Sequence, residues 1–368
     1  MTLQELMTRW NGYQIEMRRW FHQHPEESTK EVRTAERIRA ELDRAGIPWR
    51  PCGLGTGTLA RIEGAQPGRT ILLRGDIDAL SVNEETGLPY ASEVPGVMHA
   101  CGHDCHISML LTAAMIVNEI RDRLKGTIVF AFQPAEELGL GARAMIEEGA
   151  LEGVDACFGM HVWSDYPAGT VALRKGPMMA SGDQFKIHVR GKSTHGAQPQ
   201  LGADALIMGA AIAQNLQTIV SRETYPGDTA VVTVGKFHSG TRFNVVAGTA
   251  ELEGTTRTFS PAVRDRFEEQ ITRIARSTAE AMRGTADVEY LRIVPVTVND
   301  PGMIDVVTGA AGKIFGDKGV IEAAEGCTGS DSAAMTGMTA SVSTHASTSS
   351  RDKKRLRMVF SSIFSCGI

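Results

Sequence analysis

Up to about Met179, short apolar runs alternate with amphipathic segments. Apolar runs bounded by glycine or charged residues predict strands at 57–62, 70–73 and 127–132. Apolar positions spaced by three or four residues predict a helix that ends before Gly46 and a second helix at 104–120. The first helix is expected to bury four side chains: Val32, Ala35, Ile38 and Leu42. Strands that alternate with helices predict the α/β fold class.

The pattern changes after Met179. The next segments are predicted as strand 183–190, helix 203–221, strand 229–237, strand 247–257, helix 262–283 and strand 286–294. This order, β-α-β-β-α-β, is that of a ferredoxin-like α+β domain. Its first helix is expected to face the sheet with Leu206, Ala210, Ala213, Leu216 and Val220. An apolar helix at 304–315 then resumes the first domain. We therefore predict one domain at 1–179 and 295–368, interrupted by an inserted domain at 180–294.

Composition and charge narrow the class of protein. The 368 residues carry a formal net charge of −5, and 42% of them are hydrophobic. Nucleic-acid-binding domains normally have a basic surplus, so we expect no nucleic-acid partner. No apolar run approaches the roughly 18 residues of a membrane-spanning helix, and the N-terminus has no apolar secretion signal. We therefore expect a cytoplasmic protein with no membrane partner.

Four short polar stretches stand at predicted strand ends or at the turn into a helix. They are Arg74-Gly-Asp-Ile-Asp-Ala-Leu80, His99-Ala-Cys-Gly-His-Asp104, Gln133-Pro-Ala-Glu-Glu137 and Gly159-Met-His-Val-Trp163. In open α/β sheets, ligands bind outside the carboxyl ends of the strands. The sequence therefore predicts one site that gathers these stretches.

The residue types in these stretches indicate metal-assisted hydrolysis. A thiolate with imidazoles favours Zn, Mn, Co, Ni or Fe, and Cys101 and His103 are close enough on one turn to face the same ion. Additional carboxylates allow two ions about 3.5–4 Å apart. In the pair Glu136-Glu137, one carboxylate can bind metal while the other takes a proton from water. Asp78 can accept a hydrogen bond from the ring N–H of a metal-bound histidine that points away from the metal.

Each stretch also has a simpler interpretation when taken alone. A Glu-Glu pair is usually a solvated helix start, Cys-Gly-His is more often structural, and His161 alone favours a core histidine. Asp76 and Asp78 can be turn residues. The four stretches in this order argue against these separate interpretations. A nicotinamide oxidoreductase also fits poorly, because no Gly-x-Gly-x-x-Gly follows the early strands.

The stretches RGDIDAL, HACGHD, FQPAEE and MHVW, in this order and spacing, resemble those of the M20 metallopeptidase family. The amidohydrolase branch is the most similar, and the resemblance runs from about residue 10 to about 330. It implies a mixed-sheet α/β catalytic domain with an inserted lid and dimerisation domain. It also implies two divalent ions, for which Mn or Zn is the main expectation and Co or Ni the second. By motif, the metal ligands are Cys101, His103, Glu137 and His161, Glu136 is the general base, and Asp78 supports a ligand.

The resemblance extends into the inserted domain. Gly191-Lys-Ser-Thr-His195-Gly is similar to the family stretch whose histidine holds the developing oxyanion, often in the partner subunit's site. Phe243-Asn244 resembles a stretch that faces the substrate, and the arginine of Thr255-Thr-Arg257 can bind a substrate carboxylate through its bidentate fork. Taken alone, His195 and Arg257 are ordinary surface positions. The resemblance implies a homodimer through the inserted domain.

The C-terminal segment departs from the family. Its last metal-binding histidine normally follows a Gly-Ser-Glu-Asp-Phe type motif, whereas here Gly329-Ser-Asp331 is followed by a Ser/Thr-rich and then basic sequence without a helix or strand period. His345 stands in another context and is not assigned. We predict that the reading frame changes after about Asp331, so that one ion lacks a ligand. Resequencing the gene tests this prediction.

The predicted activity is hydrolysis of the amide bond of small N-acyl amino acids, with an acetyl, benzoyl or indole-acetyl group. Two other enzymes of the same family stay open, a dipeptidase and an N-acetyl-diaminopimelate deacetylase. A catalytically impaired metal-binding homologue with a scaffold role is the alternative from a different class. The intact Glu136 argues against the scaffold, and the unusual C-terminal segment argues for it.

Overall fold

The computed structural model describes residues 1–327, 329, 331 and 339–344, and the chain divides into two compact units. The first unit comprises Met1–Met178, Thr297–Glu325 and the described residues from Asp331 onwards. The second comprises Met179–Val296 and the described residues of 326–330. The borders expected from the sequence pattern, 179/180 and 294/295, fall one and two residues from these.

The first unit is built on a mixed sheet with the strand order β1-β2-β4-β3-β5-β16-β14-β7, in which β6 joins β16 and β15 joins β6. Strands β4, β3, β5 and β16 are parallel neighbours, so their carboxyl ends meet at one edge. The strands are β1 (Trp49–Pro51), β2 (Thr58–Glu63), β3 (Gln66–Asp76), β4 (Lys125–Gln133), β5 (Ala156–Val162), β6 (Val171–Leu173), β7 (Gly176–Met179), β14 (Thr297–Asn299), β15 (Val320–Glu322) and β16 (Thr339–Thr344). Parallel strands are covered on both faces, which explains their continuous apolar runs.

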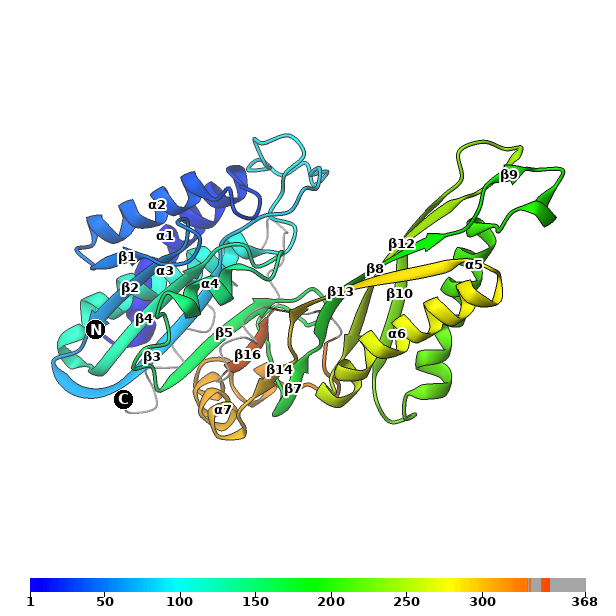
Figure 1. The fold of residues 1–368 in the computed structure, drawn as a ribbon. Coiled ribbons are helices and arrows are strands. Elements are labelled where there is room, and N and C mark those ends of the chain that lie inside the picture. Colours follow the sequence, from blue (N-terminus) through cyan, green and yellow to red (C-terminus); the bar gives the residue numbers. More distant parts are fainter. Residues whose placement is uncertain (328, 330, 332–338, 345–368) are drawn as a thin grey trace. The chain divides into compact units, whose positions relative to one another are not determined.

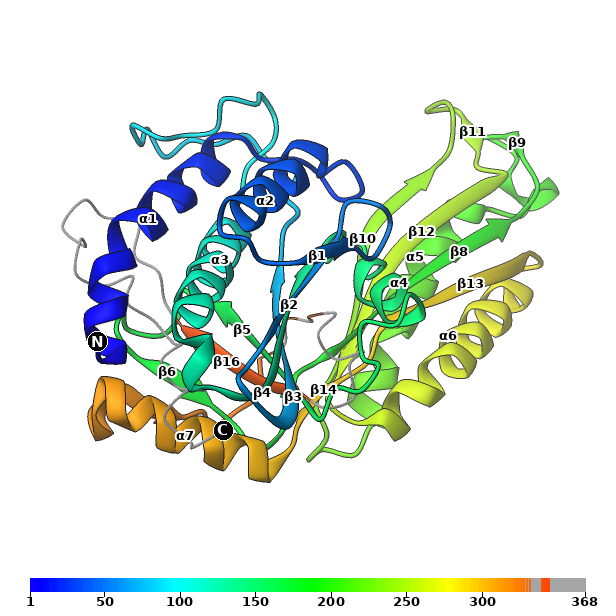
Figure 2. The same ribbon diagram turned by 90° about the vertical axis from the view of Figure 1, so that its left-hand side faces the viewer.

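Helices pack on both faces of this sheet. The helices are α1 (Leu3–Gln23), α2 (Val32–Arg44), α3 (His103–Ile120), α4 (Gly141–Glu147) and α7 (Pro301–Phe315). Helices α1, α2 and α3 share one core with the strands (Figure 2), whereas α4 covers a smaller apolar cluster on the opposite face. Helix α3 is buried along nearly its whole length, because almost every side of it is apolar.

The second unit has the ferredoxin-like arrangement. Its described residues form an antiparallel four-stranded sheet of order β10-β12-β8-β13, with two helices packed on one face (Figure 1). The elements are β8 (Ser181–Arg190), α5 (Ala205–Asn215), β10 (Ala230–Ser239), β12 (Thr249–Thr258), α6 (Pro261–Ala281) and β13 (Thr285–Val294). A short ribbon of β9 (Thr194–His195) and β11 (Val245–Val246) lies at the end of the sheet where β8 finishes and β12 begins.

Two predicted helix faces need correction. In α5, Leu206 is 42% exposed, and the buried face consists of Ala205, Met208, Ile212 and Leu216. This helix is apolar on nearly all sides, so periodicity leaves its rotation open and packing against the sheet decides it. In α2, Val32 is the first helical residue and stays 53% exposed, so the buried face begins one turn later at Ala35.

Residues 339–344 form a strand that the sequence pattern did not predict, and the predicted change of reading frame stays untested. These residues form β16, which pairs in parallel with β5 near the middle of the sheet. The segment is short, and its alternation has only two apolar residues, Ala340 and Val342, so the sequence pattern is too weak to predict a strand. His345, the last histidine of the chain, lies outside the described residues. No described helix has both the length and the apolar character needed to cross a bilayer.

Candidate metal centre

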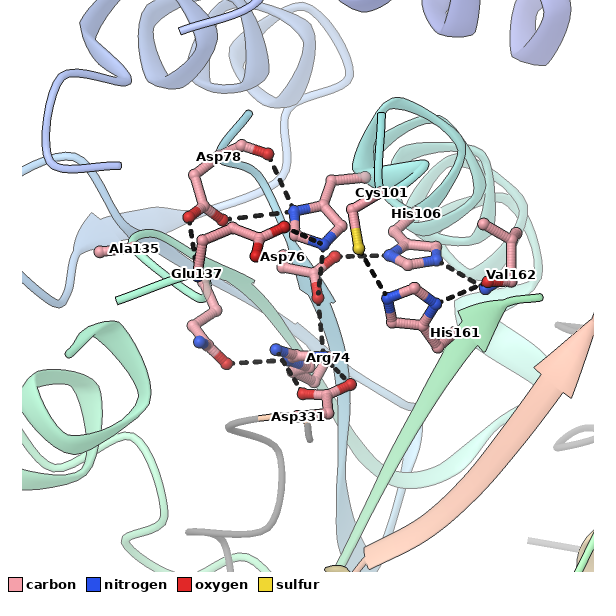
Figure 3. Close-up of polar contacts among 12 residues, drawn as sticks. Arg74, Asp76, Asp78, Cys101, His106, Ala135, Glu137, His161, Val162 and Asp331 are labelled. Carbon is pink, nitrogen blue, oxygen red and sulfur yellow. Dashed lines mark hydrogen bonds and ion pairs between the residues drawn. The ribbon is translucent and has the colours of Figure 1, made fainter. Parts of the chain in front are cut away.

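The four polar stretches meet at the carboxyl edge of the sheet in the first unit (Figure 3). Asp76 ends β3, and Glu136 and Glu137 follow β4 by three and four residues. His161 is the second-last residue of β5, Cys101 lies two residues before α3, and His103 is the first residue of α3. The parallel pairing of β3 with β4 and β5 therefore brings together residues that are up to 85 positions apart.

A glycine sets the turn that carries Cys101 and His103. Gly102 has φ 86°, a left-handed conformation that favours glycine, and caps the N-terminus of α3. A Cβ atom at this position would lie 2.4 Å from Cγ2 of Val162, which follows His161. The spacing Cys-Gly-His thus permits the close approach that places the thiol and two imidazoles together.

The side-chain contacts leave four possible metal-ligand atoms near one another: Sγ of Cys101, Nε2 of His103, Oε1 of Glu137 and Nε2 of His161. His103 directs Nδ1 to the backbone oxygen of Asp78 at 2.8 Å, and His161 directs Nδ1 to that of Val162 at 2.6 Å. This pairing assigns the proton to Nδ1 in both rings and leaves Nε2 as the acceptor. Nε2 of His161 lies 3.4 Å from Sγ of Cys101. Nε2 of His103 and Oε1 of Glu137 lie 3.9 Å apart, and neither has a hydrogen-bond partner among the described residues.

Three sets of donor atoms within 4.8 Å of one another share His103. The sets are Cys101/His103/His161, His103/Glu136/Glu137 and Asp76/His103/His106. The third set is the least available, because His106 uses both nitrogens: Nδ1 donates to Asp76 at 2.5 Å and Nε2 accepts from the backbone N–H of Val162 at 2.9 Å. The first two sets supply sulfur, nitrogen and carboxylate oxygen, which suits a transition metal.

The pKa shifts of these groups favour the binding of a positive charge. Burial raises the pKa of the Cys101 thiol to about 11 and raises the pKa of Glu137. The pKa of Glu136 is held well above its usual range, first by burial and then by the negative charge of Asp331. A divalent cation stabilises deprotonated thiols and carboxylates. The donor set, the two orphaned atoms and these raised pKa values together fit a bound metal.

The site also contains residues to which the sequence motifs assigned no role. Arg74 is buried and forms ion pairs with Asp76 at 2.9 Å and Asp331 at 3.0 Å, so Asp331 lies at the sheet edge (Figure 3). His106 was detectable, because it lies three residues after His103 and so shares its helix face. Asp331 could not be identified from the sequence as the partner of Arg74, because the two residues are 257 positions apart.

The three candidate residues of the inserted domain lie in the second unit, at two ends of its sheet. Asn244 adjoins β11 and accepts at its backbone oxygen from Gly196, next to the exposed His195. Arg257 is half-buried near the other end of β12, paired with Gly182 at the start of β8. At about 3.3 Å per step along a strand, the eight steps from Thr249 to Arg257 separate the two ends by roughly 26 Å.

A layered α/β unit that gathers a thiol, imidazoles and a carboxylate pair at the strand ends defines a metal-dependent amide hydrolase. The comparison with known families agrees, because residues 72–351 match the model of peptidase family M20/M25/M40. The chain belongs to this family. The match continues to residue 351, past the limit of about residue 330 that the motifs indicate.

Similar proteins act on N-acylated amino acids. The chain is 44% identical over 299 residues to the N-acetyl-L-cysteine deacetylase of Bacillus subtilis (strain 168), covering 81% of this chain and 72% of that protein. It is 42% identical over 268 residues to the N-acyl-L-amino acid amidohydrolase of Geobacillus stearothermophilus, covering 73% and 72%. The solved Bacillus subtilis YXEP protein, a dinuclear metal binding peptidase from the M20 family, superposes with a TM-score of 0.82 at 34% identity over 97% of each chain.

Proposed function

We propose that this protein hydrolyses the amide bond of N-acyl amino acids, releasing a carboxylic acid and an amino acid. The observation that carries the proposal is that His103 lies within 4.8 Å of two sets of possible metal ligands, the pair Glu136-Glu137 and the pair Cys101 and His161. A base next to a metal-binding carboxylate is the arrangement that hydrolysis by activated water requires. The relatives named for deacetylation and amidohydrolysis support the same bond type.

The candidate ligands are Cys101, His103, Glu137 and His161, and we propose that they hold two divalent ions. Mn or Zn fits the donor set, and Co or Ni is compatible with it. When bound, such ions supply an acidified water and polarise the scissile carbonyl. Asp78 keeps the ring of His103 in place, because its backbone and carboxylate oxygens lie 2.8 and 3.3 Å from Nδ1.

Glu136 is the proposed general base. Its carboxylate takes a proton from the attacking water, whose oxygen forms the new bond to the carbonyl carbon. The protonated Glu136 then gives this proton to the amide nitrogen as the C–N bond breaks, so that the amine leaves neutral.

We also propose that the enzyme is a homodimer through the second unit. His195 and Asn244 lie at the ribbon beyond the Thr249 end of β12, and Arg257 lies roughly 26 Å along the strand from Thr249, which is longer than an N-acyl amino acid. This separation supports the use of the two ends by two different active sites, with His195 and Asn244 stabilising the oxyanion and Arg257 holding the α-carboxylate. The ribbon end also exposes several apolar side chains: Leu201 (57%), Ile207 (54%), Phe243 (95%) and Val245 (37%).

The test is direct turnover with defined metals. The protein is loaded with Mn or Zn, and amino-acid release is measured from N-acetyl, N-benzoyl and indole-acetyl amino acids. Dipeptides and N-acetyl-diaminopimelate are included because they distinguish the other two family activities. Hydrolysis of at least one N-acyl amino acid that a chelator abolishes and added metal restores supports the proposal. Stoichiometric metal binding without turnover of any substrate contradicts it and favours the scaffold role. The cytoplasmic location stays a prediction for cell fractionation to test.

A further inference from the structure

The turn that carries Glu136 and Glu137 has an unusual backbone. Ala135, the residue before Glu136, is fully buried and has φ 46°, in the left-handed region that L-residues other than glycine rarely adopt. Its carbonyl accepts from the N–H groups of Leu140 and Gly141 at 3.2 and 3.3 Å. Such a conformation persists only when the surroundings hold it in place.

A buried glutamate from a distant segment holds this turn. Glu31 is 0% exposed, and its Oε1 accepts from the backbone N–H of Ala135 at 2.8 Å. The same oxygen accepts from the N–H of Thr29 at 2.9 Å, and Thr29 is also left-handed, with φ 69°. The second oxygen, Oε2, accepts from the hydroxyl of Thr56 at 3.0 Å. One carboxylate thus joins two left-handed turns that are 106 positions apart in the chain.

The same N-terminal segment also reaches the other side of the glutamate pair. The hydroxyl of Ser28 donates to Oδ2 of Asp78 at 2.6 Å, and that oxygen accepts from the backbone N–H of Glu137 at 3.0 Å. The backbone on both sides of Glu136 is therefore held by carboxylates that this segment anchors. No role in the proposed reaction has been given to the segment so far, and its residues do not belong to the donor sets around His103.

We propose that Glu31 is a positioning residue for the general base: its carboxylate fixes the left-handed turn at Ala135 and thereby the direction of the Glu136 side chain. The inference rests on the proposed hydrolysis for its kinetic readout. Its structural readout, the protection of the turn itself, is independent of activity. Because a misplacement of about 1 Å in a catalytic group lowers turnover about 100-fold, the loss of this anchor is expected to lower kcat by that order.

The chain supplies a matched control in Glu41. This residue lies on α2, at whose N-terminus Glu31 is the cap, and it is also buried, at 2% exposure. Its carboxylate accepts from Tyr13, Arg37 and Arg44, away from the glutamate pair. Glu41→Ala removes a buried carboxylate with a comparable number of partners, so it reproduces the loss of stability without touching the turn.

The experiment compares Glu31→Ala, Glu31→Asp, Glu31→Gln and Glu41→Ala in the metal-loaded full chain. Asp keeps the charge but is too short to reach Ala135, whereas Gln keeps an oxygen that can accept from Ala135. We expect kcat to fall about 100-fold in Glu31→Ala and Glu31→Asp with KM little changed, and to stay near wild type in Glu31→Gln and Glu41→Ala. Amide hydrogen exchange in a peptide covering 133–137 should be about tenfold faster in the first two variants only.

The outcomes separate the two proposals. Unchanged exchange at 133–137 in Glu31→Asp, or a kcat loss in Glu41→Ala equal to that in Glu31→Asp, overturns the positioning role. If Glu31→Ala does not fold, Glu31→Asp and Glu31→Gln carry the test. Faster exchange at the turn in a protein whose wild type hydrolyses no N-acyl amino acid supports the anchor and rejects the proposed function.

Discussion

The residues proposed to act in hydrolysis fall into two groups with opposite surroundings. Around Glu136, the side chains are buried and held by polar contacts: His103 and His161 contact backbone oxygens, and Asp76 contacts the side chains of Arg74 and His106. At the ribbon of the second unit, His195 is exposed and its Nδ1 accepts only from the nearby N–H of Ala197 among the contacts of the described residues. The first group is organised within one chain before substrate arrives.

Because their surroundings differ, the two regions suit different parts of the reaction. Holding metal ions and a base demands fixed geometry, because small displacements of such groups are costly. Contacts to the oxyanion and to the substrate carboxylate can instead form when substrate and a second subunit complete the site. If this contrast is correct, substitutions in the metal centre should lower turnover more than substitutions in the second unit.

Replacing the general base should have the largest effect. In Glu136→Ala, we expect turnover to fall about 10²- to 10⁴-fold with metal content unchanged, because the proton of the attacking water has no acceptor. Steady-state kinetics and metal analysis measure both quantities. Glu147→Ala is the matched control, since Glu147 also begins a Glu-Glu pair but is exposed at the end of α4. Equal activity of Glu136→Ala and the control would remove Glu136 from the mechanism.

Removing the ribbon histidine should have the next largest effect. His195→Ala is expected to lower kcat about 10²- to 10³-fold, the loss typical of one oxyanion donor. If His195 acts in the partner subunit's site, mixing Glu136→Ala with His195→Ala subunits should restore about a quarter of wild-type activity through heterodimers. His238→Ala, an exposed histidine of the same unit, is the control. An active single variant, or mixed subunits with no recovery, would contradict action across a dimer.

Arg257 should affect binding more than turnover. Both Arg257→Lys and Arg257→Ala are expected to raise KM about 10- to 100-fold for substrates with a free α-carboxylate, because the bidentate charge-assisted contact is lost. Substrates with an amidated carboxylate should bind wild type and variants equally. Arg276→Ala, on the exposed side of α6, serves as the control. A KM increase that is the same for both substrate types would assign Arg257 a structural role.

The smallest effect is a pH dependence of stability confined to the first unit. Burial alone lowers the pKa of His22, but its hydrogen bond to Asp104 at 2.8 Å and the charge of Asp104 outweigh burial and raise that pKa. A raised folded-state pKa gives stability that is complete below the unfolded value of about 6.5 and disappears as the pH rises through the folded value.

The measurement is thermal unfolding of wild type and His22→Gln from pH 6 upwards, with saturating metal. We expect the difference in melting temperature to shrink as the pH rises. Exchange in β8 and β12 of the second unit should not follow this trend, because that unit lies outside the Arg18–Asp104–His22 ion-pair cluster. A difference that stays constant over this range would show that the charge of His22 does not stabilise the fold.

The sequence by itself determined the order of elements, the ferredoxin-like pattern and the motif residues Cys101, His103, Glu136, Glu137 and His161. These features are local: strand and helix periods extend over a few residues, and each motif needs only its own turn, as Gly102 illustrates with its left-handed φ. Resemblance to a known family then added what the motifs do together. The family match and the α/β architecture confirm the family and the fold class, and the roles of the individual residues stay predictions.

The contacts between residues far apart in the chain are visible in the tertiary structure alone. Nothing near Arg74 in the sequence indicates that Asp331 pairs with it, and nothing near Ala135 indicates that Glu31 holds its N–H group. Likewise, the rotation of α5 was open because nearly all its sides are apolar, and β16 was unreadable because its identity depends on pairing with β5. Such contacts join separately coded segments, so their free energy depends on the packed chain and leaves no periodic signal in either segment.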